Sequence, residues 1–261
     1  MVKNNCTANY LKVTMGILLI VIFKIENVKA QNAEDLFKNH HKWGITGQYN
    51  IFSEADITPT NNNRINYEIF KNKRFAIGLD YNFYQHRKWN FKVGLQLQWF
   101  GNDAGYTILE EENITPFNIG NFYRTEHDRI LHLPFGVEYV FLKRGKFFIS
   151  FGGGAGISYY QFDAVTFDSS INDVPIFISN YENSKSPFYS SGHLETSIYF
   201  KRKSFMFQAS LIYNKSFKSY RKGNYEFLNL EISPDTKGEI DQSGDFMGVS
   251  LTVYLKKRST K

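Results

Sequence analysis

Apolar and polar residues alternate along the segment from Trp89 to Phe100, which reads WNFKVGLQLQWF. Successive side chains of a β-strand point to opposite faces, so this pattern predicts a strand with one wholly apolar face. Trp89 and Trp99 lie at the two ends of that face. A tilted strand of this length covers about 25 Å, which matches the height of the apolar band on an outer-membrane barrel.

The same alternation recurs in seven further segments, and sustained alternation with a period of two is the main sequence signal of strands. These segments span residues 41–53, 74–84, 129–142, 146–161, 188–201, 204–215 and 245–256. Tight polar connections at 85–88, 143–145 and 202–203 alternate with long polar ones at roughly 54–73, 102–128, 162–187 and 216–244. Soluble domains seldom carry several loops of this length, whereas outer-membrane barrels have short periplasmic turns and long external loops.

The pattern therefore predicts an all-β fold. We expect an eight-stranded antiparallel up-and-down transmembrane β-barrel over residues 41–261, with short periplasmic turns and long external loops. Two further pieces, 64–70 and 224–232, also have strand character. Counting them as barrel strands would break the alternation of short and long connections, so we interpret them as hairpin extensions above the membrane.

The polar face of the strands indicates which side of the barrel meets lipid. It consists mostly of Gly, Ser, Gln and Asn, with few charges per strand. Such residues suit the crowded lumen of an eight-stranded barrel, whereas a face in water would carry more Lys, Glu and Asp. We therefore expect the apolar face to point outward. The alternative is a soluble secreted or periplasmic lipocalin-like ligand-binding barrel, with that face inward.

Several ionisable residues fall on the predicted lumen face. Isolated buried charges are unfavourable, so we expect a hydrogen-bonded and ion-paired plug and no open pore. Tryptophan favours the membrane–water boundary, which predicts an interface girdle. The predicted lumen network comprises Asp80, Lys92, His132, Glu138, His193 and Glu195, and the predicted girdle comprises Trp43, Trp89 and Trp99.

Residues 1–30 have the pattern of a cleaved signal peptide. Positive charge precedes the short apolar run 13–23, and Val28 and Ala30 suit cleavage after Ala30. Residues 31–40 then form a short polar segment. Cleavage would remove the only cysteine, Cys6, and would lower the formal net charge from +6 to +3, because residues 1–30 hold four Lys and one Glu. The remaining charge is dispersed, which is not the pattern of a nucleic-acid-binding protein.

Other motifs give weaker signals. The glycine-rich run 152–156 continues an alternating strand, and no helix pattern follows it, so it is not a phosphate-binding loop. A lipid A-modifying barrel enzyme using His132 or His193 is the less favoured alternative, because no His-x-Ser-Asn element is present. The histidines at 40, 41 and 86 lack partners at metal-ligand spacing. We therefore predict no enzyme activity, no cofactor and no metal site.

The segment Ile130–Tyr139, which reads ILHLPFGVEY, is followed by a turn and a glycine-rich strand over 147–160. This arrangement resembles a recurring element of the PorT-like outer-membrane β-barrel family. The resemblance implies a small outer-membrane barrel of the OmpA/OmpX type, and it carries over no functional residue. Some members are linked to protein secretion or gliding, and most have no assigned activity.

We therefore expect a structural or interaction role in the outer membrane. The expected partners are outer-membrane lipid and lipopolysaccharide, together with a surface ligand or a secretion-machinery protein bound by the external loops. Binding residues often lie on such loops, although the same side chains could pack above the barrel rim. The loop candidates are Tyr106, Phe117, Phe122, Tyr123, Tyr181, Tyr220, Arg221 and Tyr225.

Overall fold

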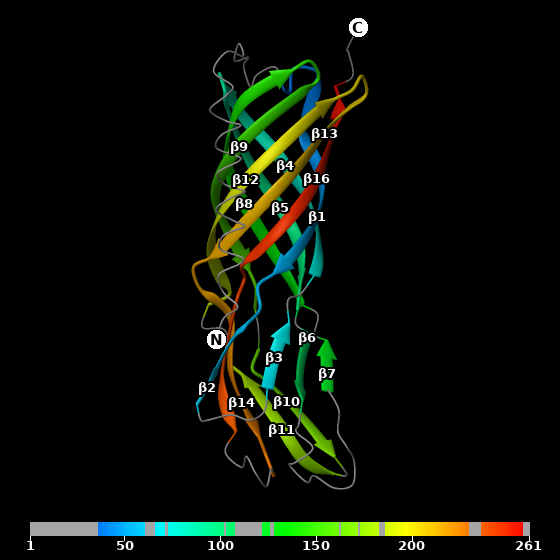
Figure 1. Cartoon of the computed structure of the whole chain (residues 1–261). Coiled ribbons are helices and arrows are strands. Elements are labelled where there is room, and N and C mark those ends of the chain that lie inside the picture. Colours follow the sequence, from blue (N-terminus) through cyan, green and yellow to red (C-terminus); the bar gives the residue numbers. More distant parts are fainter. Residues whose placement is uncertain are drawn as a thin grey trace, which may run out of the picture.

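The molecule is elongated and built from strands, with a barrel at one end and smaller sheets at the other (Figure 1). No helix among the described residues is long and apolar enough to cross a membrane. The computed structural model describes residues 36–60, 66–70, 73–101, 103–107, 122–125, 128–161, 163–171, 173–182, 186–229 and 236–257. The predicted signal peptide lies outside this part of the chain.

Eight antiparallel strands form a closed barrel, and each one pairs with its neighbours along the chain. The ring closes where the first strand pairs with the last, with Ile45 opposite Val253. The predicted eight-stranded up-and-down barrel is confirmed, and every strand begins and ends within two residues of its predicted bounds. The strands are β1 (His40–Phe52), β4 (Lys73–His86), β5 (Trp89–Phe100), β8 (Asp128–Arg144), β9 (Phe147–Tyr159), β12 (Phe188–Lys201), β13 (Phe205–Ser216) and β16 (Phe246–Lys256).

The alternating sequence places apolar side chains outside and polar side chains inside the barrel. In β16, Met247, Val249 and Leu251 are exposed, whereas the intervening Ser250 and Thr252 are buried. The register brings residues of like orientation together across the sheet, because directly opposite residues of an antiparallel pair share one face. The outward face is therefore apolar on each strand, and the lumen is polar.

Three tight turns join barrel strands at one end of the barrel, which we call the short-turn end. They connect β4 to β5, β8 to β9, and β12 to β13, as predicted. Arg87 and Gly145 adopt positive φ angles of 51° and 61°, which these tight reversals require.

The four long connections form an extension beyond the opposite end of the barrel (Figure 1). Each connection contributes two strands, so the predicted hairpins at 64–70 and 224–232 belong to a larger structure than their sequences indicate. One sheet has the order β10-β11-β14-β15-β2, and the other has the order β3-β6-β7. The strands are β2 (Asp56–Pro59), β3 (Asn66–Phe70), β6 (Asp103–Thr107), β7 (Phe122–Thr125), β10 (Val165–Ile171), β11 (Val174–Tyr181), β14 (Ser219–Phe227) and β15 (Lys237–Ser243).

The two sheets of the extension share one hydrophobic core. Tyr67 of β3 packs on Phe177 and Tyr225 of the larger sheet, with ring centroids 5.2 and 4.8 Å apart. Burial of several aromatic rings explains how loops without a strong alternating pattern form ordered strands. The core consists of Tyr67, Ile69, Ile176, Phe177, Tyr181, Tyr225, Phe227 and Ile240.

Apolar clusters close both ends of the barrel lumen. At the short-turn end, Leu36 and Phe37 pack into the lumen, and the Phe37 ring lies 5.1 Å from that of Tyr254. The segment 31–40 was expected to be polar and irregular, yet these two residues are fully buried. The short-turn cluster is Leu36, Phe37, Val140, Phe148, Tyr199, Met206 and Tyr254, and the cluster toward the extension is Phe52, Phe100, Ile130, Tyr160, Tyr189, Tyr220 and Phe246.

Candidate functional site

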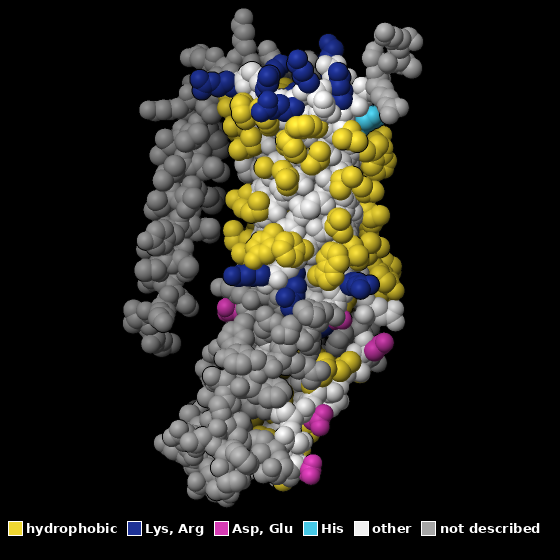
Figure 2. Space-filling model, turned by 90° about the vertical axis from the view of Figure 1, so that its right-hand side faces the viewer, with side chains coloured by type: hydrophobic (Ala, Val, Ile, Leu, Met, Phe, Trp, Pro, Cys, Tyr) yellow, Lys and Arg dark blue, Asp and Glu magenta, His cyan; other side chains and the backbone are white. Residues whose placement is uncertain are grey.

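A belt of exposed apolar side chains covers the barrel wall (Figure 2). All eight barrel strands contribute to this apolar belt, and Phe75, Val249 and Leu194 are each more than half exposed. Monomeric soluble proteins rarely expose contiguous apolar patches above a few hundred Å². The outer wall is therefore built for an apolar environment.

Aromatic side chains mark both edges of the apolar belt. At the short-turn end, Trp43 stacks on Tyr81 with ring centroids 4.3 Å apart, and the Trp89 ring lies 5.0 Å from that of Tyr139. Trp99 lies near the opposite edge of the belt, directly across from Arg129 of β8. The three predicted girdle residues thus lie where the belt meets more polar surface.

Inside the barrel, Lys92 connects carboxylates from two other strands. Its Nζ lies 2.7 Å from Glu138 Oε1 of β8 and also contacts Glu195 of β12. Glu138 additionally accepts hydrogen bonds from the amides of Asn90 and Gln208, at 3.1 and 3.2 Å. Buried charges of this kind are tolerable only when they are paired and hydrogen-bonded.

The remaining predicted lumen residues lie beside this cluster. Asp80 accepts hydrogen bonds from Thr46 at 2.5 Å and Thr252 at 3.2 Å. His132 Nδ1 lies 2.8 Å from Ser158 Oγ. His193 is 8% exposed, and its Nδ1 has no hydrogen-bond partner among the described residues. All six predicted residues therefore face the lumen.

The His132–Ser158 pair has the spacing of a base and a nucleophile, and it lies in the barrel interior. The Tyr220 hydroxyl donates to Ser158 Oγ at 2.8 Å, and both belong to the buried interior beneath the aromatic cluster. No hydrogen bond in the described part of the chain joins His132 to a carboxylate that would orient it. The described residues also contain no group of three His, Cys, Asp or Glu able to hold a metal ion.

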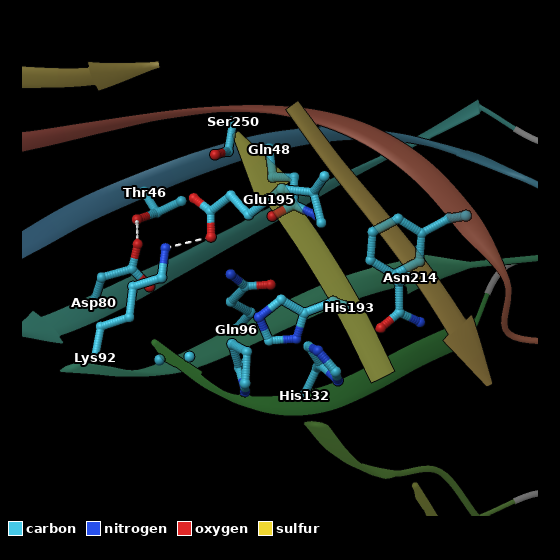
Figure 3. A pocket seen from close by; sticks show the side chains of 15 residues that line it. Thr46, Gln48, Asp80, Lys92, Gln96, His132, His193, Glu195, Asn214 and Ser250 are labelled. Atoms are coloured by element: carbon cyan, nitrogen blue, oxygen red, sulfur yellow. Dashed lines mark hydrogen bonds and ion pairs between the residues drawn. The ribbon is translucent and has the colours of Figure 1, made fainter. Parts of the chain in front are cut away.

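A small polar cavity of about 30 Å³ lies in the lumen beside the Lys92 cluster (Figure 3). Gln48 Oε1, Asn214 Oδ1 and His193 Nδ1 are buried and lack hydrogen-bond partners among the described residues. Such a space holds about one or two water molecules, which are the usual partners of buried polar atoms. The cavity is too small for an organic ligand.

On the extension side, an ion pair between a buried arginine and a partly exposed aspartate joins the barrel to the extension. Arg221 of β14 contacts Asp128 of β8, and its Nε donates to the Tyr160 hydroxyl at 2.7 Å. Burial raises the pKa of Tyr160 well above its usual range. The hydroxyl therefore remains protonated and donates to Asp128 Oδ2, also at 2.7 Å.

The loop residues singled out from the sequence mostly have packing roles. Tyr181, Tyr220, Arg221 and Tyr225 are each at most 4% exposed, so these four side chains do not lie on the surface of the extension. They pack inside the extension or the barrel mouth, which was the alternative. Tyr106, Phe122 and Tyr123 lie on β6 and β7, whose side-chain surroundings are not described, and Phe117 lies outside the described residues.

Sequence reasoning missed several residues that complete the lumen network. The Tyr199 hydroxyl donates to Glu138. The Gln208 amide donates to Glu138 and to Glu195, both at 3.2 Å. Ser197 donates to Glu195 at 2.8 Å. Their lumen-facing position follows from strand alternation, but nothing in the sequence shows which side chains meet across the lumen.

No protein-family model and no curated protein matches the chain. Among solved structures, the chain is similar to the outer membrane protein OprG from Pseudomonas aeruginosa, with 12% identity and a TM-score of 0.46 over 85% of this chain and 98% of that one. The P. putida toluene transporter TodX is more distant, with 6% identity and a TM-score of 0.18 over 85% of this chain and 91% of that one. Similarities this weak say nothing about function.

Proposed function

We propose that this protein is an integral outer-membrane β-barrel with a structural or interaction role. The observation that carries the proposal is the apolar belt, to which all eight strands of a closed barrel contribute. A closed barrel leaves no unpaired strand edge, so its backbone polar groups are satisfied within lipid. A lipocalin-like carrier would instead place this apolar face around its lumen.

The filled lumen argues against a transport role. The Lys92 cluster occupies the middle of the barrel, and apolar clusters close the two ends. Charged groups held by several hydrogen bonds make the interior rigid, so we expect no steady conductance. The extension is then the part of the molecule that is available to other components.

We further propose that the extension is external and meets a surface ligand or a secretion-machinery protein, and that the barrel wall contacts outer-membrane lipid and lipopolysaccharide. The resemblance of Ile130–Tyr139 to the PorT-like family supports a secretion-linked partner. The predicted signal peptide over residues 1–30 would supply the export that this location needs.

Membrane fractionation combined with a heat-modifiability gel tests the location. A folded barrel resists detergent without heating, so boiled and unboiled samples from the outer-membrane fraction should differ in mobility. Recovery in the soluble periplasmic fraction, without such a shift, would favour the lipocalin-like alternative. Planar-bilayer recording tests the closed lumen, and a large steady conductance would contradict it.

A further inference from the structure

The short-turn end of the barrel is strongly basic. Its described residues include twelve Lys and Arg, of which eight have exposed side chains and four have half-buried ones. The segments that form this end, 36–44, 81–91, 139–148, 199–207 and 254–257, contain no Asp or Glu. We call the twelve residues the basic rim: Lys38, Lys42, Arg87, Lys88, Lys143, Arg144, Lys146, Lys201, Arg202, Lys203, Lys256 and Lys257.

The extension side carries charges of both signs, because exposed basic residues such as Lys218, Lys222 and Lys237 lie there with exposed acidic residues. Figure 2 shows Lys and Arg without Asp or Glu above the upper edge of the apolar belt, whereas both Lys or Arg and Asp or Glu appear below its lower edge. Among the described residues, the exposed acidic side chains therefore lie only on the extension side, and the short-turn end carries basic side chains alone. The exposed acidic residues of the extension and its connections are Glu54, Asp56, Asp163, Asp168, Asp173, Glu182, Glu226 and Glu239.

The basic rim is continuous with the apolar belt. Lys88 Nζ lies 5.3 Å from the centre of the Tyr139 ring, and the Arg202 guanidinium lies 4.9 Å from the centre of the Phe200 ring. Long basic side chains at such a boundary lay their apolar stems on the belt and extend their charges toward the polar side. This arrangement places the charges at the depth of lipid headgroups.

We propose that the basic rim binds the phosphates of anionic phospholipids in the leaflet at the short-turn end. This inference rests on the proposed membrane location. Twelve Lys and Arg side chains gathered at one end of the barrel create a positive potential there, and a layer of anionic headgroups is attracted to such a potential. Each Lys or Arg near an anionic leaflet also gains attraction that decays within a Debye length.

The three tryptophans of the chain provide a local test, because all lie at belt edges. Trp99→Phe leaves Trp43 and Trp89 as reporters of the short-turn edge, and the double variant Trp43→Phe/Trp89→Phe leaves Trp99 as the reporter of the other edge. The full chain is reconstituted in vesicles of phosphatidylcholine and phosphatidylglycerol mixed in equal amounts. In separate samples, one lipid or the other carries brominated chains, which quench nearby tryptophan.

At the short-turn edge, we expect brominated phosphatidylglycerol to quench tryptophan fluorescence about fivefold or more strongly than brominated phosphatidylcholine does. At the Trp99 edge, the preference for phosphatidylglycerol should be smaller. Replacing Arg144, Lys146, Lys203 and Lys256 with Gln should remove most of the preference at the short-turn edge only. Substitutions that retain the charge, Arg to Lys and Lys to Arg at the same four positions, should keep the preference for phosphatidylglycerol. High salt should weaken the preference.

Equal quenching by the two lipids at the short-turn edge would overturn the inference while leaving the membrane location intact. A preference that survives the four Gln substitutions would also overturn it. Absence of quenching by either lipid at every tryptophan would instead show that the barrel wall does not face lipid, and the proposed function would fail with it.

Discussion

Lys92 of β5 and Glu138 of β8 form an ion pair of 2.7 Å in the barrel lumen, where their side chains are only 13% and 1% exposed. The same ammonium group contacts Glu195, so one cation serves two carboxylates from different strands. A pair in this position is poorly screened by solvent, and its loss leaves acidic groups without a counterion. The free energy of unfolding of the barrel therefore depends strongly on Lys92.

We expect Lys92→Met to lower the free energy of unfolding by about 3–5 kcal/mol, because it leaves buried carboxylates without their cation. Urea unfolding of the reconstituted barrel, followed by the unboiled mobility of the folded form, measures this loss. The double variant Lys92→Met/Glu195→Gln removes one of the stranded charges and should recover part of the stability. A single variant as stable as the parent would contradict the assigned role of the pair.

Gly154 of β9 lies where the backbone of β8 approaches closely. A Cβ at this position would lie 1.8 Å from the Phe135 carbonyl oxygen, so Gly154→Ala must push the two strands apart. We expect a loss of about 1–3 kcal/mol, as in other overpacked interiors, measured by the same unfolding assay.

Gly47 provides the matched control for that substitution, because no atom lies within 4 Å of its added Cβ. We expect Gly47→Ala to leave stability unchanged or to raise it by about 0.5–1 kcal/mol, since alanine restricts the unfolded chain. Equal losses of stability in the two variants would show that the close approach of β8 does not explain why glycine is needed at position 154.

The barrel strands were predictable because one physical pattern specifies them. In β16, alternation of Val249 and Leu251 with Ser250 sets both the strand and the face of each side chain. Alternation does not give the contacts across the lumen. Whether Lys92 meets Glu138 or Asp80 depends on the stagger and tilt of the closed barrel, which involve all eight strands together.

The extension and the closure of the lumen at the short-turn end were harder to predict for a different reason. Tyr67 and Tyr225 bury each other, although they are far apart in the chain. The short strands that carry them contain too few residues to show a clear alternation of apolar and polar positions. Leu36 and Phe37 are only two apolar residues in a polar stretch, and such a pair has no periodicity. Their roles become visible only when the barrel supplies a space for them.

The buried contact of Arg221 with Asp128 should hold the extension on the barrel mouth. Arg221→Met leaves Asp128 without its cation and removes the hydrogen bond to Tyr160, so we expect faster proteolysis of the extension while the barrel remains heat-modifiable. The neighbouring Lys222 pairs with Asp241 at the surface, where both side chains are well exposed. Exposed pairs contribute about 0–1 kcal/mol, so Lys222→Met should leave the cleavage rate nearly unchanged. Similar acceleration in both variants would contradict the special role of Arg221.

Phe37 should be required to close the short-turn end of the lumen. Its ring packs edge-on against Tyr199 and Tyr254 at centroid distances of 6.5 and 5.1 Å, and it is only 2% exposed. We expect Phe37→Ala to cost about 3–5 kcal/mol in the unfolding assay, through lost burial and the space left behind. Lys38→Ala, at the adjacent exposed position, serves as the control and should stay within about 0.5 kcal/mol of the parent. If Phe37→Ala matched that control, residues 36 and 37 would not close the barrel, and the short-turn cluster would have to be stable without them.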